Sequence, residues 1–279
     1  MDCSLFEPNR VIEQPMSNLI ETEIVAGVAT LTLNRPEKRN ALTREFIGEM
    51  NEWVTSVSLD DTVRLFLIQS KGDVFCAGMD LGEMQSRIGA VDPESEWQKD
   101  SDVYNDLVSK IFQLEIPTLA VLPGPVLAGG TGMVFACDIV LASNNVFFQL
   151  PEPRRGITAA MVCPLLLYRT NVSTASYLLL SGKRVEADDA LRMGLVNELV
   201  PKDQLMTRRN ELVASILTGS QSALGITKKH LRKMANVDVS DQIRASASVS
   251  AEARKTDDAK EGLAAFLEKR KPGWDASIS

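Results

Sequence analysis

The 279-residue chain contains a single histidine, His230, and this scarcity weighs against several kinds of catalytic site. A Ser–His or Cys–His nucleophilic site would have one candidate base, and that base lies in the basic, amphipathic segment 226–233, which is typical of a surface helix. A His-ligated zinc site is disfavoured for the same reason. We therefore expect acid–base chemistry to fall to carboxylates, and we predict no metal site.

Cysteine is scarce as well. Cys3, Cys76, Cys137 and Cys163 are far apart in the sequence, so neither a zinc-ligand spacing nor a redox dithiol is present. Three of them lie in apolar or glycine-rich surroundings that are typical of small buried side chains. The N-terminus lacks a basic start followed by a long apolar run, and no segment is long enough to cross a bilayer. We expect a cytoplasmic protein with no membrane partner.

The chain also lacks an excess of positive charge. Its formal net charge is −7, whereas non-specific binding to nucleic acid or to anionic membranes requires a basic face. We therefore predict no nucleic-acid partner. The hydrophobic content of 44% and the charged content of 24% are ordinary for a globular protein.

Two glycine-rich stretches are the most informative features that are present: residues 75–81 (FCAGMDL) and residues 129–132 (GGTG). Each follows a short apolar run and is predicted to open a helix, where the first backbone N–H groups have no intrahelical partners. Such turns also cradle phosphates or simply redirect the chain. If both faced one point, they would give two donors to one oxygen atom, an oxyanion hole that stabilises an enolate.

Periodicity predicts an α/β fold whose C-terminal part is mostly helical. Thr43 and Asp80 are expected to cap helices, and residues 87–100, which are polar and irregular, are expected to form a mobile loop. Strands are expected at residues 20–25, 28–33, 63–69, 118–122, 138–142, 146–149 and 194–200.

Glu152 is the third unusual element, because it lies between two prolines directly after the apolar segment 146–148. The prolines predict an extended, restrained backbone. A carboxyl at the end of an apolar strand is a candidate general base, since desolvation raises its pKa toward neutrality. The alternative is a surface acid that pairs with Arg154 or Arg155.

Together these segments resemble the crotonase (enoyl-CoA hydratase/isomerase) superfamily over nearly the whole chain. The resemblance implies a spiral of ββα units over residues 1–200 and a helical C-terminal trimerisation region over 201–279. It also implies an acyl-CoA thioester substrate, no cofactor apart from the coenzyme A of that substrate, and a homotrimer or a dimer of trimers. The resemblance is carried by residues 34–42 (NRPEKRNAL), 75–81, 129–138, 150–152, 195–197 and 265–272.

The resemblance further implies individual roles. The backbone N–H groups of Ala77 and Gly129 would hold the thioester oxygen, and Glu152 would move protons. Residues expected to bind substrate are Lys38, Arg39 and Ala41 near the CoA nucleotide, Gly78, Met79, Asp80, Leu81, Gly130 and Gly132 in the glycine loops, and Phe266 and Lys269, which match positions that in relatives reach a neighbouring subunit's CoA.

One departure leaves the reaction open. Two-glutamate hydratases of the superfamily carry their second glutamate where this chain has Gly132. A single glutamate suits hydration, Δ3,Δ2-enoyl-CoA isomerisation, or decarboxylation of an acidic acyl-CoA, and a non-catalytic acyl-CoA-binding protein is a further alternative. Because the glycine turn and residues 156–165 resemble bacterial 3-methylglutaconyl-CoA hydratase-like proteins, we favour hydration of an unsaturated acyl-CoA, with a branched acyl group among the candidates. Arg154 and Arg155 would then either recognise a substrate carboxylate or remain solvated.

Overall fold

The computed structural model describes residues 19–235 and 239–275. The predicted hairpin is present as the antiparallel pair β1 (Ile20–Val25) and β2 (Val28–Leu33). Cys3 lies outside the described residues. The predicted regions 1–200 and 201–279 also include residues that the structure does not describe, at the N-terminus of the first and within and at the end of the second. The division of the chain at residue 200 stays a prediction.

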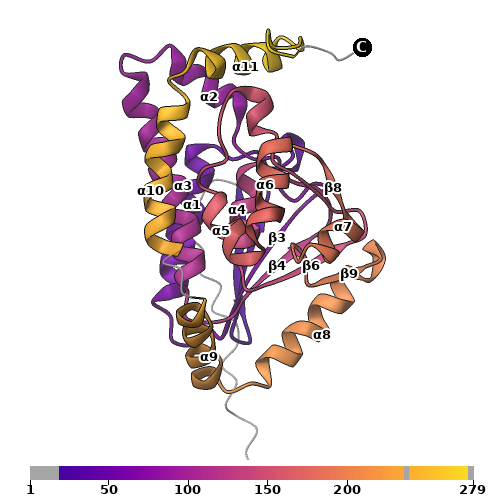
Figure 1. Cartoon of the computed structure of the whole chain (residues 1–279). Coiled ribbons are helices and arrows are strands. Elements are labelled where there is room, and N and C mark those ends of the chain that lie inside the picture. Colours follow the sequence, from indigo (N-terminus) through magenta and orange to yellow (C-terminus); the bar gives the residue numbers. More distant parts are fainter. Residues whose placement is uncertain (1–18, 236–238, 276–279) are drawn as a thin grey trace, which may run out of the picture.

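A six-stranded sheet forms the centre of the molecule, in the order β1-β2-β3-β4-β6-β9, and every pairing after the first is parallel (Figure 1). Its inner strands bury both faces: in β3, Phe66 and Ile68 join the main core, whereas Leu65 and Leu67 join a smaller cluster on the opposite face. Double burial explains why these strands are continuous apolar runs in the sequence. The remaining strands of this sheet are β3 (Leu65–Ser70), β4 (Thr118–Leu122), β6 (Ile139–Ser143) and β9 (Glu198–Val200).

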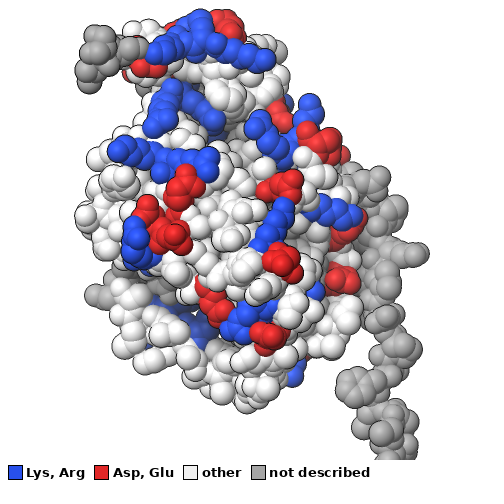
Figure 2. All heavy atoms as spheres, turned by 90° about the vertical axis from the view of Figure 1, so that its right-hand side faces the viewer, with Lys and Arg blue, Asp and Glu red and all other residues white. Residues whose placement is uncertain are grey.

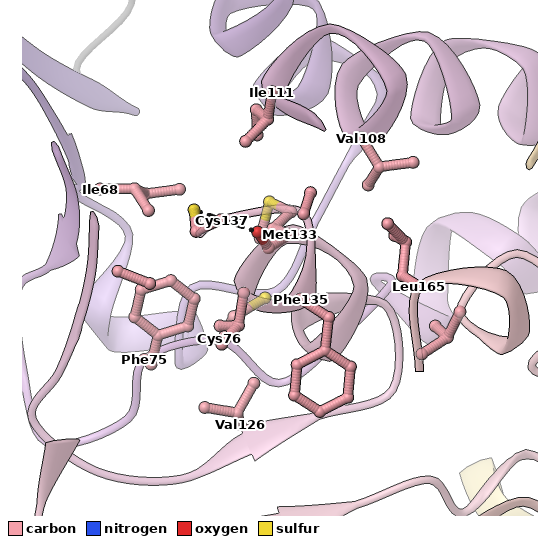
Figure 3. Packing of buried hydrophobic residues seen from close by; sticks show 14 of the residues in the cluster. Ile68, Phe75, Cys76, Val108, Ile111, Val126, Met133, Phe135, Cys137 and Leu165 are labelled. Atoms are coloured by element: carbon pink, nitrogen blue, oxygen red, sulfur yellow. Dashed lines mark hydrogen bonds between the residues drawn. The ribbon is translucent and has the colours of Figure 1, made fainter. Parts of the chain in front are cut away.

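A second sheet consists of three short strands, β5 (Val126–Leu127), β7 (Phe147–Gln149) and β8 (Val185–Glu186). The path from β4 through β5 into α4 (Gly129–Phe135) is one complete ββα unit. An isolated bridge between Cys76 and Val126 ties the first glycine loop to this sheet, and Figure 3 shows both side chains close to the buried residues of α4. The α/β fold built from ββα units is confirmed.

Three helices follow the first strands. α1 (Arg44–Ser58) and α2 (Leu81–Ile88) begin where predicted, after the capping side chains of Thr43 and Asp80. The mobile loop predicted for residues 87–100 is wrong, because α3 (Pro93–Gln113) begins inside it. The segment is polar because its first turns carry charged partners: Arg44 bonds to Glu96 and Asp100.

The C-terminal part is helical, as predicted, and packs onto the core (Figure 1). α8 (Leu205–Leu217) covers the smaller apolar cluster, α10 (Val239–Ala253) lies along α3, and α11 (Asp257–Leu267) packs against α2 and residues 152–155. No helix in the described ranges is long and apolar enough to cross a membrane. The other helices are α5 (Cys163–Arg169), α6 (Val172–Ser181), α7 (Ala187–Arg192) and α9 (Gln221–Met234).

Candidate active site

The two glycine loops lie against each other. A β-carbon placed on Gly78 would come within 2.5 Å of the Ala128 β-carbon and 3.3 Å of the Gly129 nitrogen. One on Gly130 would lie 2.7 Å from the β-carbon of Cys76. Glycine is therefore required at both positions by the close approach of the loops, and Gly78 also has a φ of +83°. The structure thus brings the two loops to one point, as predicted.

The segment 34–42 braces the first loop. The Arg35 guanidinium donates to the Asp80 carboxylate at 2.9 Å and to the Ala41 carbonyl at 2.8 Å. The Asn40 amide donates to two backbone carbonyls that follow β3. Asp80 in turn accepts hydrogen bonds from the first turn of α2. These contacts hold the first loop in place without touching the pocket.

Ala77 does not fit its predicted role as an oxyanion donor, because its N–H already donates to the Arg39 carbonyl at 3.0 Å. The loop presents Met79 instead. Leu42 forms a parallel bridge with Met79 and bonds to the residues on either side of it. The N–H of the central residue in such a bridge points away from the partner strand. Met79 lines the pocket described below, whereas Ala77 does not.

Gly129 supplies the second candidate donor. It is the first residue of α4, so its N–H has no intrahelical partner. Ala128 precedes it with φ +49° and ψ −128°, a conformation that is costly for a residue with a side chain. This backbone sets the direction of the Gly129 N–H. Within residues 19–235 and 239–275, no hydrogen bond from the Met79 or Gly129 N–H is found.

A small pocket, with a cavity volume of about 50 Å³, is lined by Met79, Gly129 and Glu152. The Glu152 side chain is 6% exposed, and its Oε2 has no partner among the described residues. Burial raises the pKa of this carboxyl from 4.5 to about 7, and its own backbone N–H and the Arg155 charge offset only part of that rise. The pocket is lined by Met79, Leu81, Met84, Tyr104, Ala128, Gly129, Glu152, Arg155, Ile157, Thr158, Ala159, Met161, Val162, Ser250 and Arg254.

The predicted extended backbone at Glu152 is wrong. Residues Glu152–Arg155 form a 3₁₀ turn that ends at Gly156, whose φ is +67°. Pro153 occupies an early position of that turn, where its fixed φ is compatible and its missing N–H is not needed. The turn directs Glu152 into the pocket.

The two neighbouring arginines have separate surroundings. Arg154 is exposed, whereas Arg155 lines the pocket and places its guanidinium carbon 4.5 Å from the centre of the Phe266 ring. Arg254, which is 7% exposed, lines the same pocket and donates to the Trp97 carbonyl. Arg155 interacts with the charge of Glu152, and Arg254 with that of Asp100, but neither arginine forms a close ion pair among the described residues. The predicted alternative of a surface acid at Glu152 paired with an arginine is therefore not observed.

Tyr104 is a pocket residue that the sequence analysis missed. It comes from α3, is 1% exposed, and donates its hydroxyl hydrogen bond to the Gly129 carbonyl. A β-carbon on Gly132 would lie only 2.2 Å from the Tyr104 hydroxyl oxygen. The hydroxyl therefore occupies the space where a side chain at Gly132 would begin. The available signal was a glycine inside a short helix, which often marks a close approach by another group.

The other predicted substrate residues, namely Lys38, Arg39, Ala41, Gly78, Asp80, Gly130, Gly132, Phe266 and Lys269, are not among the described residues that line the pocket. Lys38 and Arg39 are exposed on the loop that holds the turn Pro36–Lys38. Phe266 is 46% exposed and contacts Arg155 of its own chain, and Lys269 is exposed. Their contacts with CoA stay predictions. Of the predicted residues, the pocket brings together Met79, Leu81, Gly129 and Glu152.

Two candidate backbone donors and a buried carboxyl, placed by ββα units, are the arrangement expected of a crotonase-type enzyme. Residues 23–277 match the family model described as enoyl-CoA hydratase/isomerase, and the chain belongs to this family. It is 32% identical to a crotonyl-CoA hydratase of Syntrophomonas wolfei, over 88% of this chain and 94% of that protein. It is 34% identical to a mevalonyl-coenzyme A hydratase of Aspergillus fumigatus, over 90% of this chain and 92% of that protein. A crystal structure of an enoyl-CoA hydratase from Mycobacterium avium subsp. paratuberculosis superimposes with a TM-score of 0.82 at 26% identity, covering 93% of this chain and 99% of that one.

Proposed function

We propose that the protein is an enoyl-CoA hydratase, which adds water to the double bond of an unsaturated acyl-CoA and removes it in the reverse direction. The observation that carries this proposal is the buried Glu152 carboxyl, whose Oε2 has no described partner, in the same pocket as Met79 and Gly129. The similarity to proteins named as hydratases supports it.

In the proposed mechanism, the Met79 and Gly129 N–H groups bind the thioester oxygen. Negative charge collects on this oxygen when the thioester becomes an enolate, and preorganised donors strengthen as that charge develops. Removing one such donor in acyl-transfer enzymes costs roughly 3–4 kcal/mol of transition-state stabilisation. Glu152 moves the proton, because a carboxyl whose pKa is about 7 can both accept and donate one near neutral pH.

We further propose an acyl group with a branch or a distal carboxylate. The pocket walls are largely apolar, and Arg155 and Arg254 both line the pocket. Neither guanidinium forms a close ion pair among the described residues, so each can approach a carboxylate of the substrate. A guanidinium binds a carboxylate through two parallel hydrogen bonds. Arg155, rather than Arg154, is the neighbour of Glu152 that is placed for this contact. The relative named mevalonyl-coenzyme A hydratase is consistent with a branched acyl group.

Isomerisation is the second candidate. Glu152 is the only carboxylate among the described residues that line the pocket, and one carboxylate suffices to carry a proton between two carbons. This reaction needs no water molecule, so the choice of substrate distinguishes it from hydration.

A substrate panel tests these proposals. Crotonyl-CoA, 3-methylglutaconyl-CoA and 3-hexenoyl-CoA are assayed with the wild type, with Glu152→Gln and with the control Glu45→Gln, whose side chain is exposed on α1. We expect hydration by the wild type and by the control, and a loss of roughly 10²–10⁴-fold in Glu152→Gln. Isomerised 3-hexenoyl-CoA without hydration of the other two would establish the isomerase. Tight acyl-CoA binding in calorimetry with no turnover would identify a binding protein, and full activity of Glu152→Gln would show that the base is misassigned.

A further inference from the structure

The Tyr104 hydroxyl is the polar group that stands where the side chain of residue 132 would begin. It is buried, it lines the pocket together with Glu152, and its oxygen lies 2.2 Å from the β-carbon position of Gly132. Its single proton is engaged by the Gly129 carbonyl. A phenol whose proton is engaged still has acceptor lone pairs. The hydroxyl can therefore offer a hydrogen-bond acceptor to a group in the pocket.

We propose that Tyr104 is a catalytic residue that holds the attacking water: its oxygen accepts a hydrogen bond from the water that adds to the substrate, while Glu152 accepts the other. This inference rests on the proposed hydratase function. Two-glutamate hydratases carry their second glutamate at the position of Gly132. In this chain, Tyr104 takes the place of that glutamate and holds the water together with Glu152.

The proton balance closes with Glu152 alone. The water oxygen bonds to the β-carbon while one water proton passes to Glu152, and the electron pair of the double bond moves toward the thioester to give the enolate. Glu152 then returns that proton to the α-carbon, and the enolate electron pair forms the new carbon–hydrogen bond. The product is a 3-hydroxyacyl-CoA, Glu152 is again a carboxylate, and Tyr104 has kept its proton throughout.

The environment of Tyr104 favours this division of roles. Burial raises the pKa of the phenol well above 10, and the nearby Cys76 and Glu152 raise it further. A neutral phenol positions a water molecule but does not deprotonate it. Tyr104 therefore has no need to act as a base.

A purely structural role is the competing explanation, because Tyr104 also bonds to Gly129, whose N–H is a proposed oxyanion donor. Two readouts separate the roles. Hydration of crotonyl-CoA needs the water, whereas exchange of the α-protons of butyryl-CoA in D₂O needs only Glu152 and the oxyanion donors.

In Tyr104→Phe we expect hydration to fall on the order of 10²-fold, the cost of a misplaced reactant, and α-proton exchange to stay within about threefold of wild type. Tyr168→Phe is the control, because Tyr168 is a partly buried tyrosine that lies outside this pocket. Equal losses of hydration and exchange in Tyr104→Phe would overturn the proposal in favour of a structural role, and so would unchanged hydration. A wild type that exchanges α-protons but hydrates none of the panel substrates would defeat the hydratase proposal, and this inference with it.

Gly132→Ala approaches the same hydroxyl from the other side; the single variant is the test if Tyr104→Phe fails to fold, and the double variant adds a comparison if Tyr104→Phe folds. The alanine β-carbon would displace the Tyr104 hydroxyl. In the double variant Gly132→Ala/Tyr104→Phe the hydroxyl is absent, and the nearest ring carbon would lie 3.3 Å from that β-carbon. We expect Gly132→Ala to lose hydration while retaining exchange, and the double variant to be no worse than Tyr104→Phe alone. Undiminished hydration in Gly132→Ala, or losses that simply multiply in the double variant, would contradict the contact.

Discussion

Burial gives the ionisable side chains around the pocket very different chemical properties. It raises the pKa of Glu152 to about 7, which places this carboxyl within the physiological range. The same cause raises the pKa of the Cys76 thiol to about 12, so Cys76 stays protonated and is no nucleophile. Glu152 is thus the group near the glycine loops that is suited to move a proton at neutral pH.

The activity should follow the ionisation of Glu152. The carboxylate must be charged to accept a proton from water, and below its pKa of about 7 it is protonated. We therefore expect kcat/KM for hydration to rise as the pH increases through about 7 and then to reach a plateau, with a tenfold decrease for each pH unit on the acid side.

A pH series of initial rates from pH 5 to pH 9 measures this profile, with the melting temperature followed at each pH so that unfolding is recognised. Glu45→Gln, as the exposed control, should reproduce the wild-type profile. A rate that is flat from pH 5 to pH 8 would be inconsistent with Glu152 as the base.

Single residues also show how far the sequence can predict a site. Glu152 could be found because two prolines and an apolar strand surround it in the sequence. The donor in the first loop could not be identified, since the bridge between Leu42 and Met79 decides which N–H faces the pocket. Tyr104 was missed because it lies on helix α3, 25 residues before the Gly129 carbonyl that it contacts.

At the scale of elements, helix α9 is attached to the sheet through one buried cation. The Lys228 ammonium lies 2.6 Å from the Asp138 carboxylate and donates to the Ile116 carbonyl at 2.8 Å. Asp138 also accepts hydrogen bonds from the backbone N–H and hydroxyl of Thr118, at the start of β4. The basic pattern of residues 226–233 predicted a surface helix, and His230 is exposed, but the pattern could not single out Lys228 as buried.

Lys228→Ala should therefore be strongly destabilising. It leaves Asp138 and the Ile116 carbonyl without their cation, and breaking a buried ion pair costs about 3–5 kcal/mol. Asp138 is 33% exposed, so we expect a value near the lower limit, about 3 kcal/mol. The neighbouring Lys229 is exposed, and Lys229→Ala should change stability by no more than about 0.5 kcal/mol. Urea unfolding measures both, and equal effects of the two variants would refute this account of Lys228.

Elements with one dominant pattern were predictable, and those fixed by tertiary contacts were not. The β1–β2 hairpin and the start of α1 follow from alternation and from a capping side chain. The first turns of α3 were assigned to a loop because they bury charged partners of Arg44 instead of an apolar stripe. The strands β5 and β8 contain two residues each, which is too short for any period.

At the scale of the whole molecule, the chain leaves apolar side chains of its C-terminal helices in contact with solvent. Ile226, Leu231 and Met234 of α9 are 70%, 61% and 60% exposed. Exposed apolar side chains on one helix are suited to self-association. On the face shown in Figure 2, by contrast, acidic and basic side chains are interspersed.

The family resemblance implies a trimer or a dimer of trimers, and the exposed apolar side chains lead us to expect α9 at an interface between copies. The double variant Ile226→Asp/Leu231→Asp places two charges on that surface and should shift the protein toward monomers, because burying an unpaired charge costs far more than the apolar contact contributes. His230 is no control, because it lies on the same face of α9 as Ile226 and Met234. Asn210→Asp adds one acid of nearly the same shape at an exposed position of α8 and should leave the assembly intact. Light scattering coupled to gel filtration measures the mass of each form. A monomeric wild type would contradict the assembly, and an unchanged mass in the double variant would exclude α9 from the interface. If Phe266 and Lys269 reach the CoA of a neighbouring subunit, the KM of the dissociated variant should rise while its α11 stays folded.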